Sequence, residues 1–180
     1  ICFVDFFVLE TVCEYIHNWQ KHGKKFIKVS VNMSRTTLRK KNVVQKAVAI
    51  CSKYQIEPQM IEIEITESIG GLEKKLITRL MDDFHAAGFS IALDDFGSGF
   101  SNIAALAEND FDVVKFDKSL IDTIFENDKS RTVIQQAINL CNAVNKNIET
   151  VGEGVETEQQ LQILKEYGCD IGQGLSLIHI

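Results

Sequence analysis

The sequence has little of what marks several classes of protein. It has one proline in 180 residues and no low-complexity segment, so neither a proline-rich linker nor a disordered tail is indicated. No apolar run approaches the roughly 20 residues of a membrane helix, and the first residues lack the zones of a signal peptide. The net charge is −6, and like charges form only short runs such as Arg39-Lys40-Lys41, which argues against a nucleic-acid polymer as partner. The composition therefore predicts an ordinary globular domain.

Cysteine and histidine are too scattered to form a metal site. The five cysteines are widely spaced and mostly embedded in apolar patterns, which favours reduced core thiols over a disulfide framework or a zinc site. His17, His22 and His85 lie in helix-like patterns and form no His-Glu-x-x-His motif. We therefore expect a cytoplasmic domain, whether or not its parent protein is anchored in a membrane.

Helix-like and strand-like patterns alternate along the chain. Helical spacing from Val8 to Trp19 precedes an apolar strand pattern at 26–31, and this succession recurs. The other predicted strands span 60–66, 90–93, 111–116 and 148–151, and the other predicted helices span 43–54, 76–87, 133–144 and 157–168. Strands separated by helices predict a parallel sheet with right-handed crossovers. The predicted fold class is α/β, a (β/α)8 TIM-like barrel, and because that fold takes roughly 250 residues we expect it to be incomplete at both ends.

Acidic and amide side chains recur at the ends of the predicted strands. Asp94 and Asp95 follow the apolar run 89–93 and precede a loop containing Gly97 and Gly99. Adjacent buried carboxylates repel each other, so a divalent cation is the expected partner. The further strand-end candidates are Asn32, Glu64, Glu67, Lys115, Glu153 and Gln173. Oxygen ligands suit a hard cation such as Mg²⁺ or Mn²⁺ rather than zinc, and barrel enzymes place their chemistry at these strand ends.

Each of these residues, taken alone, also has a structural explanation. Asn32 could begin a loop, and Glu62 and Glu64 could both be exposed on an edge strand. Lys115 could be a solvated strand-end charge, and Glu153 could flank a glycine turn. Their recurrence at consecutive strand ends favours a shared site.

A series of motifs resembles the EAL-domain family over residues 1–174. In order these are Val31-Asn32-Met33-Ser34, Glu64-Ile65-Thr66-Glu67-Ser68, Asp94-Asp95-Phe96-Gly97-Ser98-Gly99-Phe100-Ser101, Lys115-Phe116-Asp117, Glu153-Gly154-Val155-Glu156-Thr157 and Gly168-Cys169-Asp170 with Gln173-Gly174. The resemblance implies a partial EAL domain at 1–174 and a phosphodiesterase that hydrolyses cyclic di-GMP to linear pGpG with two Mg²⁺ or Mn²⁺ ions. The Glu-Ala-Leu segment that names the family would lie upstream of Ile1, so we expect the fragment itself to be inactive.

The resemblance also implies a role for each matching residue. The implied metal ligands are Asn32, Glu64, Asp94 and Asp95. Asp95 or a neighbouring acid would draw the proton from the attacking water, Lys115 would hold water or phosphate charge, Glu153 would lie near the metal cluster and Gln173 would order the water.

A second set of matching residues would act around this site. Glu67 would anchor the loop after the aspartates, which Gly97 and Gly99 allow to move. Asp117 belongs to the same set, although it could simply cap a helix beginning near Lys118. The implied partners are cyclic di-GMP, a second copy in a homodimer, and an upstream GGDEF or sensor domain in the parent.

Two other functions remain open from the sequence. A catalytically silent EAL domain would act as a cyclic di-GMP receptor, but such domains generally lose metal ligands, and those visible here are retained. A barrel of the enolase type also combines strand-end acids, Mg²⁺ and lysine, but the Asp-Asp-Phe-Gly segment argues against it.

The last six residues do not fit the rest of the chain. Residues 175–180, Leu-Ser-Leu-Ile-His-Ile, are what one reading frame of a widely used sequencing adapter encodes. We therefore expect a non-native tail there.

Overall fold

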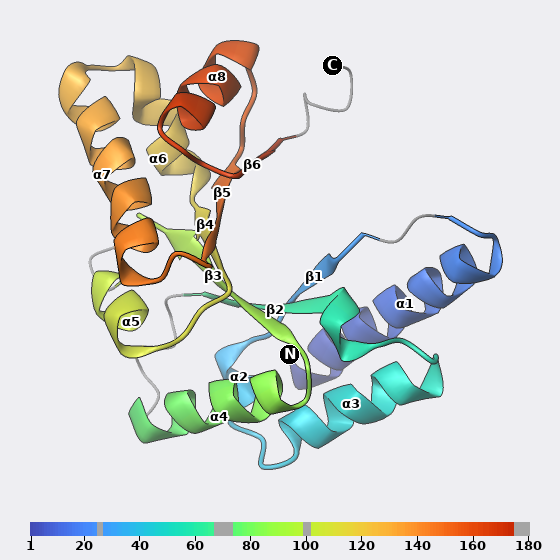
Figure 1. Cartoon of the computed structure of the whole chain (residues 1–180). Coiled ribbons are helices and arrows are strands. Elements are labelled where there is room, and N and C mark those ends of the chain that lie inside the picture. The colour runs from blue at the N-terminus through green and yellow to red at the C-terminus, as the bar shows by residue number, and fades with distance from the viewer. Residues whose placement is uncertain (25–26, 67–73, 99–101, 175–180) are drawn as a thin grey trace. The chain divides into compact units, whose positions relative to one another are not determined.

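The fold is described from a computed structural model of the chain (Figure 1). The description covers all residues except 25–26, 67–73, 99–101 and 175–180. The predicted tail therefore lies outside the described residues. The chain divides into two compact units, Ile1–Ile91 and Ala92–Ile180, and each is described by itself.

The first unit alternates helices with two parallel strands. Its elements are α1 (Cys2–Lys21), β1 (Val29–Asn32), α2 (Arg35–Leu38), α3 (Val43–Lys53), a 3-10 turn (Pro58–Met60), β2 (Ile61–Thr66) and α4 (Lys74–Ala86). β1 and β2 run in parallel, with Val29 opposite Ile61 and Asn32 opposite Glu64. This register places two of the predicted ligands side by side at the carboxyl ends of their strands.

The strand β2 is buried along almost its whole length. Ile61, Ile63 and Ile65 are buried, and Glu62 and Glu64 are buried too, at 6% and 5% exposure. The edge-strand explanation of these two glutamates is therefore wrong. Ser30 Oγ donates a 2.8 Å hydrogen bond to Glu62 Oε1, which satisfies one of the buried carboxylate oxygens.

The second unit contains four parallel strands in chain order. Its elements are β3 (Ser90–Phe96, whose first two residues belong to the first unit), α5 (Asn102–Glu108), β4 (Val113–Phe116), α6 (Lys118–Asp122), a 3-10 turn (Thr123–Phe125), α7 (Asp128–Val144), β5 (Glu149–Glu153), α8 (Glu158–Glu166) and β6 (Ile171–Gln173). β3 pairs with β4, β4 with β5 and β5 with β6. Ala92, Val113 and Val151 form a buried cluster on three of these strands.

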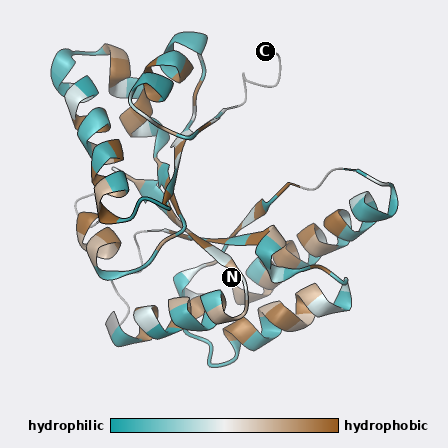
Figure 2. Ribbon diagram, viewed as in Figure 1, coloured by the Kyte–Doolittle hydropathy of each residue, from teal (hydrophilic) through white to brown (hydrophobic). Residues whose placement is uncertain are grey.

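Side-chain caps begin the helices α6, α7 and α8. Thr157 Oγ1 accepts a hydrogen bond from the Gln160 backbone amide, and the Gln160 side chain accepts one from the Thr157 backbone amide, which forms a capping box at the start of α8. In Figure 2 the helices carry both hydrophobic and hydrophilic residues, as amphipathic helices do. Within the described residues, no helix combines the length and the apolar character needed to cross a membrane.

The structure also differs from the expected pattern in places. β3 runs three residues past its predicted end at Leu93, so Asp94 and Asp95 lie within the strand rather than after it. β6 was not predicted because its three residues are too few to show a period. On α1, the expected inward positions Val8 and Trp19 are 40% and 37% exposed, whereas Leu9, Cys13 and Ile16 are buried.

Candidate active site

Three carboxylates gather at the carboxyl ends of β3 and β5. Oxygen atoms of Asp94, Asp95 and Glu153 all lie within 4.8 Å of one another. The chain thus brings together residues separated by almost sixty positions, as the strand-end argument predicted. An all-oxygen donor set of this kind fits a hard divalent cation.

A β-bulge explains how two adjacent aspartates reach the same cluster. In a regular strand, neighbouring side chains point to opposite faces of the sheet. Here Leu93 pairs with Val114 and Phe96 with Phe116, so Asp94 and Asp95 together oppose the single residue between them on β4, Lys115. Asp95 adopts φ 58°, in the left-handed region that aspartate tolerates better than most residues. The extra residue changes the direction of one side chain, as bulges near functional sites do.

Lys115 lies between the carboxylates. Its Nζ is 2.5 Å from Glu153 Oε1 and 3.7 Å from Asp94 Oδ1, and its side chain is only 7% exposed. The Asp95 backbone amide donates a further hydrogen bond of 3.1 Å to Asp94 Oδ1. Three carboxylates and one ammonium leave the cluster with a formal excess of negative charge, which a cation would offset.

Gln173 is the neighbour of Glu153 in the sheet. The β5 and β6 register pairs the two residues, and the side chains of paired residues on parallel strands lie on the same face. Gln173 itself is exposed. The structure therefore places Gln173 next to the carboxylate cluster through the register of its strand.

A hydrogen-bonded pair holds β6 in this register. Asp170 Oδ2 accepts bonds of 2.8 Å from the Thr150 amide and 2.7 Å from the Thr150 hydroxyl, whose oxygen accepts a 3.1 Å bond from the Asp170 amide. Thr150 is fully buried on β5. Asp170 belongs to one of the sequence motifs, but no local pattern indicates this role for it or points to Thr150.

In the first unit, Asn32 and Glu64 form a second polar pair. Asn32 Nδ2 donates a 2.8 Å hydrogen bond to Glu64 Oε2, across the register of β1 and β2. The hydrogen bond fixes one oxygen of the buried glutamate. The amide oxygen of Asn32 and the carboxylate of Glu64 are both of the type that hard cations bind.

Asp5 on α1 holds the segment that follows Asn32. Its Oδ2 accepts hydrogen bonds from the Ser34 amide at 2.9 Å, the Ser34 hydroxyl at 2.5 Å and the Thr37 hydroxyl at 2.6 Å. Burial acts to raise the pKa of Asp5, but the bonds from Ser34 and Thr37 together outweigh it, and the pKa lies below its usual value. No local sequence pattern indicates this role of Asp5, because its partners are some thirty positions away.

The remaining predicted residues are placed less centrally. Asp117 is the N-cap of α6 and accepts hydrogen bonds from the Ser119 amide and hydroxyl, as the structural explanation anticipated. Gly97 has φ 98°, and a Cβ there would lie 2.9 Å from Leu120 Cδ2, so glycine fits both the turn and the close approach. Glu67 and Gly99 lie outside the described residues.

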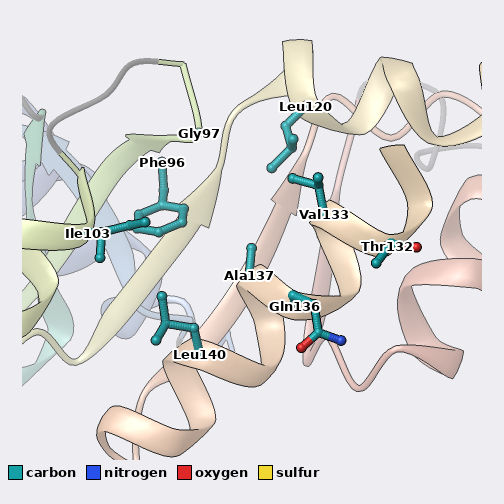
Figure 3. A pocket seen from close by; sticks show the side chains of 9 residues that line it. All are labelled: Phe96, Gly97, Ile103, Leu120, Thr132, Val133, Gln136, Ala137 and Leu140. Atoms are coloured by element: carbon teal, nitrogen blue, oxygen red, sulfur yellow. The ribbon is translucent and has the colours of Figure 1, made fainter. Parts of the chain in front are cut away.

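An apolar cavity adjoins the bulge within the second unit. Its volume is about 450 Å³, and its lining consists of Phe96, Gly97 and residues of α5, α6 and α7 (Figure 3). Phe96, Ile103, Val133, Ala137 and Leu140 contribute hydrocarbon to its wall. Because a phosphodiester needs cations and hydrogen-bond donors, this cavity does not suit a phosphate group.

The sequence and the fold both match a known class of domain. The family model for the EAL domain matches residues 3–179, and the chain therefore belongs to the EAL-domain family. The predicted family membership is confirmed.

Named relatives and solved structures agree with this assignment. "Probable cyclic di-GMP phosphodiesterase PdeA" of Escherichia coli (strain K12) is 31% identical over 172 residues, which cover 94% of this chain and 23% of PdeA. The structure "PaMucR Phosphodiesterase, c-di-GMP complex" matches with a TM-score of 0.87 and 25% identity, over 97% of this chain and 70% of that one. The EAL domain of Mycobacterium smegmatis DcpA matches with a TM-score of 0.87 and 28% identity, over 94% and 76%.

These matches confirm the predicted fold class. The chain has the mixed α/β fold of those EAL domains, and its parallel strands follow in chain order, which is the topology of an incomplete TIM-like barrel. The chain spans about a quarter of the length of curated relatives such as PdeA.

Proposed function

We propose that this chain is part of a domain that hydrolyses cyclic di-GMP to linear pGpG. The observation that carries the proposal is the bulge in β3, which gathers Asp94, Asp95 and Glu153 around Lys115 in a member of the EAL family. Relatives named as cyclic di-GMP phosphodiesterases, and a solved phosphodiesterase complex with c-di-GMP, support the same substrate.

The proposed cofactors are two Mg²⁺ or Mn²⁺ ions. Asn32, Glu64, Asp94 and Asp95 are the proposed ligands, and the oxygen atoms that they offer suit these hard cations. When bound, such ions would supply Lewis-acid activation of water and neutralise phosphate charge. The Asn32–Glu64 hydrogen bond would orient the glutamate for this role, as residues around a ligand do in other metal sites.

The other side chains have roles in binding and proton transfer. Lys115, held between Asp94 and Glu153, would attract a phosphate oxygen while remaining paired with carboxylates. Asp95 or a neighbouring acid would accept the proton of the attacking water. Gln173 would orient that water from the strand beside Glu153.

The remaining features of the proposal concern residues and partners around this core. Glu67, Gly97 and Gly99 would govern the loop after the aspartates. The backbone amide of Asp117 donates a hydrogen bond to the Phe96 carbonyl and would hold the start of α6 beside that loop. A homodimer, an upstream GGDEF or sensor domain and a cytoplasmic location are the proposed context of the domain.

Hydrolysis tests the proposal directly. The domain, expressed with the flanking sequence of its parent, would be incubated with cyclic di-GMP and Mg²⁺ or Mn²⁺, and pGpG would be followed by chromatography. We expect product from the parent, loss of at least 100-fold in rate with Asp94→Asn, and no comparable loss with the exposed-site control Glu126→Gln. Binding of cyclic di-GMP without product in the parent would refute hydrolysis and indicate a receptor.

A further inference from the structure

We propose that Cys13 and Cys51 form a site of reversible covalent modification, in which a peroxide oxidises the two thiols to an intramolecular disulfide joining α1 to α3. The two residues are 38 positions apart, and their sulfurs lie 3.9 Å from each other. Of the five cysteines, all of which the structure describes, these two form the thiol pair within hydrogen-bonding range. The formation of this bond does not depend on the proposed hydrolysis.

The geometry brings the sulfurs close to bonding distance. A disulfide has an S–S length of roughly 2.0 Å, so the sulfurs must approach each other by about 1.9 Å from 3.9 Å. Rotation of the two cysteine side chains and a shift of the helices would supply this movement.

Other contacts hold α1 and α3 together on either side of the pair. Lys53 Nζ lies 2.5 Å from Glu10 Oε1, and Lys46 Nζ lies 3.9 Å from the centre of the Phe6 ring. These contacts join the same two helices as the thiols do. They keep Cys13 and Cys51 facing each other, which raises the effective concentration of one thiol at the other.

The two sulfurs differ in their readiness to ionise. The hydrogen bond from Cys13 lowers the pKa of Cys51 despite burial, because the thiol of Cys13 stabilises a thiolate beside it. The same hydrogen bond, followed by burial, raises the pKa of Cys13. Either sulfur can donate this hydrogen bond; with Cys13 as the donor, Cys51 is the thiol that would react first with the oxidant and Cys13 the one that would resolve the product.

The reaction balances with hydrogen peroxide or an organic peroxide as the oxidant. The Cys51 thiolate attacks one peroxide oxygen, the O–O bond breaks, and Cys51 becomes a sulfenic acid while the leaving oxygen is protonated to water or an alcohol. The Cys13 sulfur then attacks the Cys51 sulfur, the S–O bond breaks, and water leaves with the Cys13 proton. Two electrons pass from the two sulfurs to the peroxide.

Burial sets how the oxidant reaches the pair. Cys13 and Cys51 are 0% and 1% exposed, so reaction requires a local opening between α1 and α3. Once the bond forms, it fastens the helix that carries Asp5, and with it the segment that follows Asn32. Oxidation would therefore restrict the movement of α1 and of the segment after Asn32. Any effect of this on catalysis rests on the proposed function.

Mass spectrometry without reduction tests the inference. The folded chain would be treated with hydrogen peroxide, alkylated with iodoacetamide and digested with trypsin. We expect a linked pair of peptides, residues 1–21 and 47–53, with a mass lower by about 2 Da than the same two peptides with Cys2 alkylated and with Cys13 and Cys51 as thiols. Dithiothreitol should release the two peptides.

Matched variants identify the sulfurs. Cys2→Ser and Cys141→Ser should keep the link, whereas Cys13→Ser should abolish it and leave Cys51 alkylated or oxidised alone. Circular dichroism would show that Cys13→Ser remains folded. Cys51→Ser should also abolish the linked peptide pair, which tests the second sulfur independently. Alkylation of Cys51 in the peroxide-treated parent without a link to Cys13, or both thiols unreacted under conditions that oxidise Cys2, would overturn the proposal.

Discussion

Replacement of Asp5 tests how the first unit holds the segment after β1. Asp5→Ala removes the acceptor of three hydrogen bonds, from the Ser34 amide, the Ser34 hydroxyl and the Thr37 hydroxyl. Thr37 is fully buried, so its hydroxyl loses a charged partner that water cannot readily replace. Ser34 Oγ lies 3.1 Å from Thr37 Oγ1 and can recover part of the loss.

The expected cost follows from the energies of such bonds. A hydrogen bond to a charged group contributes about 1.5–3 kcal/mol net, and an unsatisfied buried group costs about 1–3 kcal/mol. Because the three bonds share one oxygen and one is partly recovered, we expect Asp5→Ala to lower the free energy of unfolding by about 2–3 kcal/mol. Urea unfolding followed by circular dichroism measures this, with Glu14→Ala on the exposed face of α1 as a control that should change stability by less than about 0.5 kcal/mol.

The pH dependence has a definite sign. The folded-state pKa of Asp5 is lowered, so its contribution is complete above the unfolded-state pKa of about 3.9 and is lost as the pH falls below that value toward the folded-state pKa. Asp5→Asn should therefore reduce the loss of stability below about pH 4.

If Asp5→Ala unfolded at the same urea concentration as the parent, with an unchanged slope, the proposed role of the three hydrogen bonds would be refuted.

Three further substitutions test the second unit. Gly97→Ala should lower the melting temperature measurably, because it combines φ 98° with a close approach to a neighbouring side chain, and Gly23→Ala, at φ 66° with open space around it, should cost less. Asp94→Asn should weaken Mn²⁺ binding at least 10-fold by isothermal titration, and unchanged affinity beside the control Asp128→Asn would count against the proposed ligand. Thr150→Val should destabilise the fold by about 1–3 kcal/mol in urea, whereas Thr150→Ser keeps the hydroxyl and should retain most of the stability; equal losses in both would show that packing, not hydrogen bonding, decides.

Local patterns in the sequence were sufficient for much of the fold. The alternation of helical and strand periods, the capping box at Thr157 and the apolar run before Asp94 depend on residues close together in the chain. Such signals predicted the parallel α/β architecture and the strands that carry Asn32, Glu64, Lys115 and Glu153. They could not show short elements such as β6, whose conformation is imposed by pairing with β5.

The sequence by itself determined which side chains occur at which strand ends, because strand spacing and residue type are both local properties. Only the tertiary structure decided how those side chains meet. The bulge that brings Asp94 and Asp95 together arises from the pairing of β3 with β4, and the contact of Cys13 with Cys51 from the packing of two helices. Register and packing depend on residues far apart in the chain, so no local pattern encodes them.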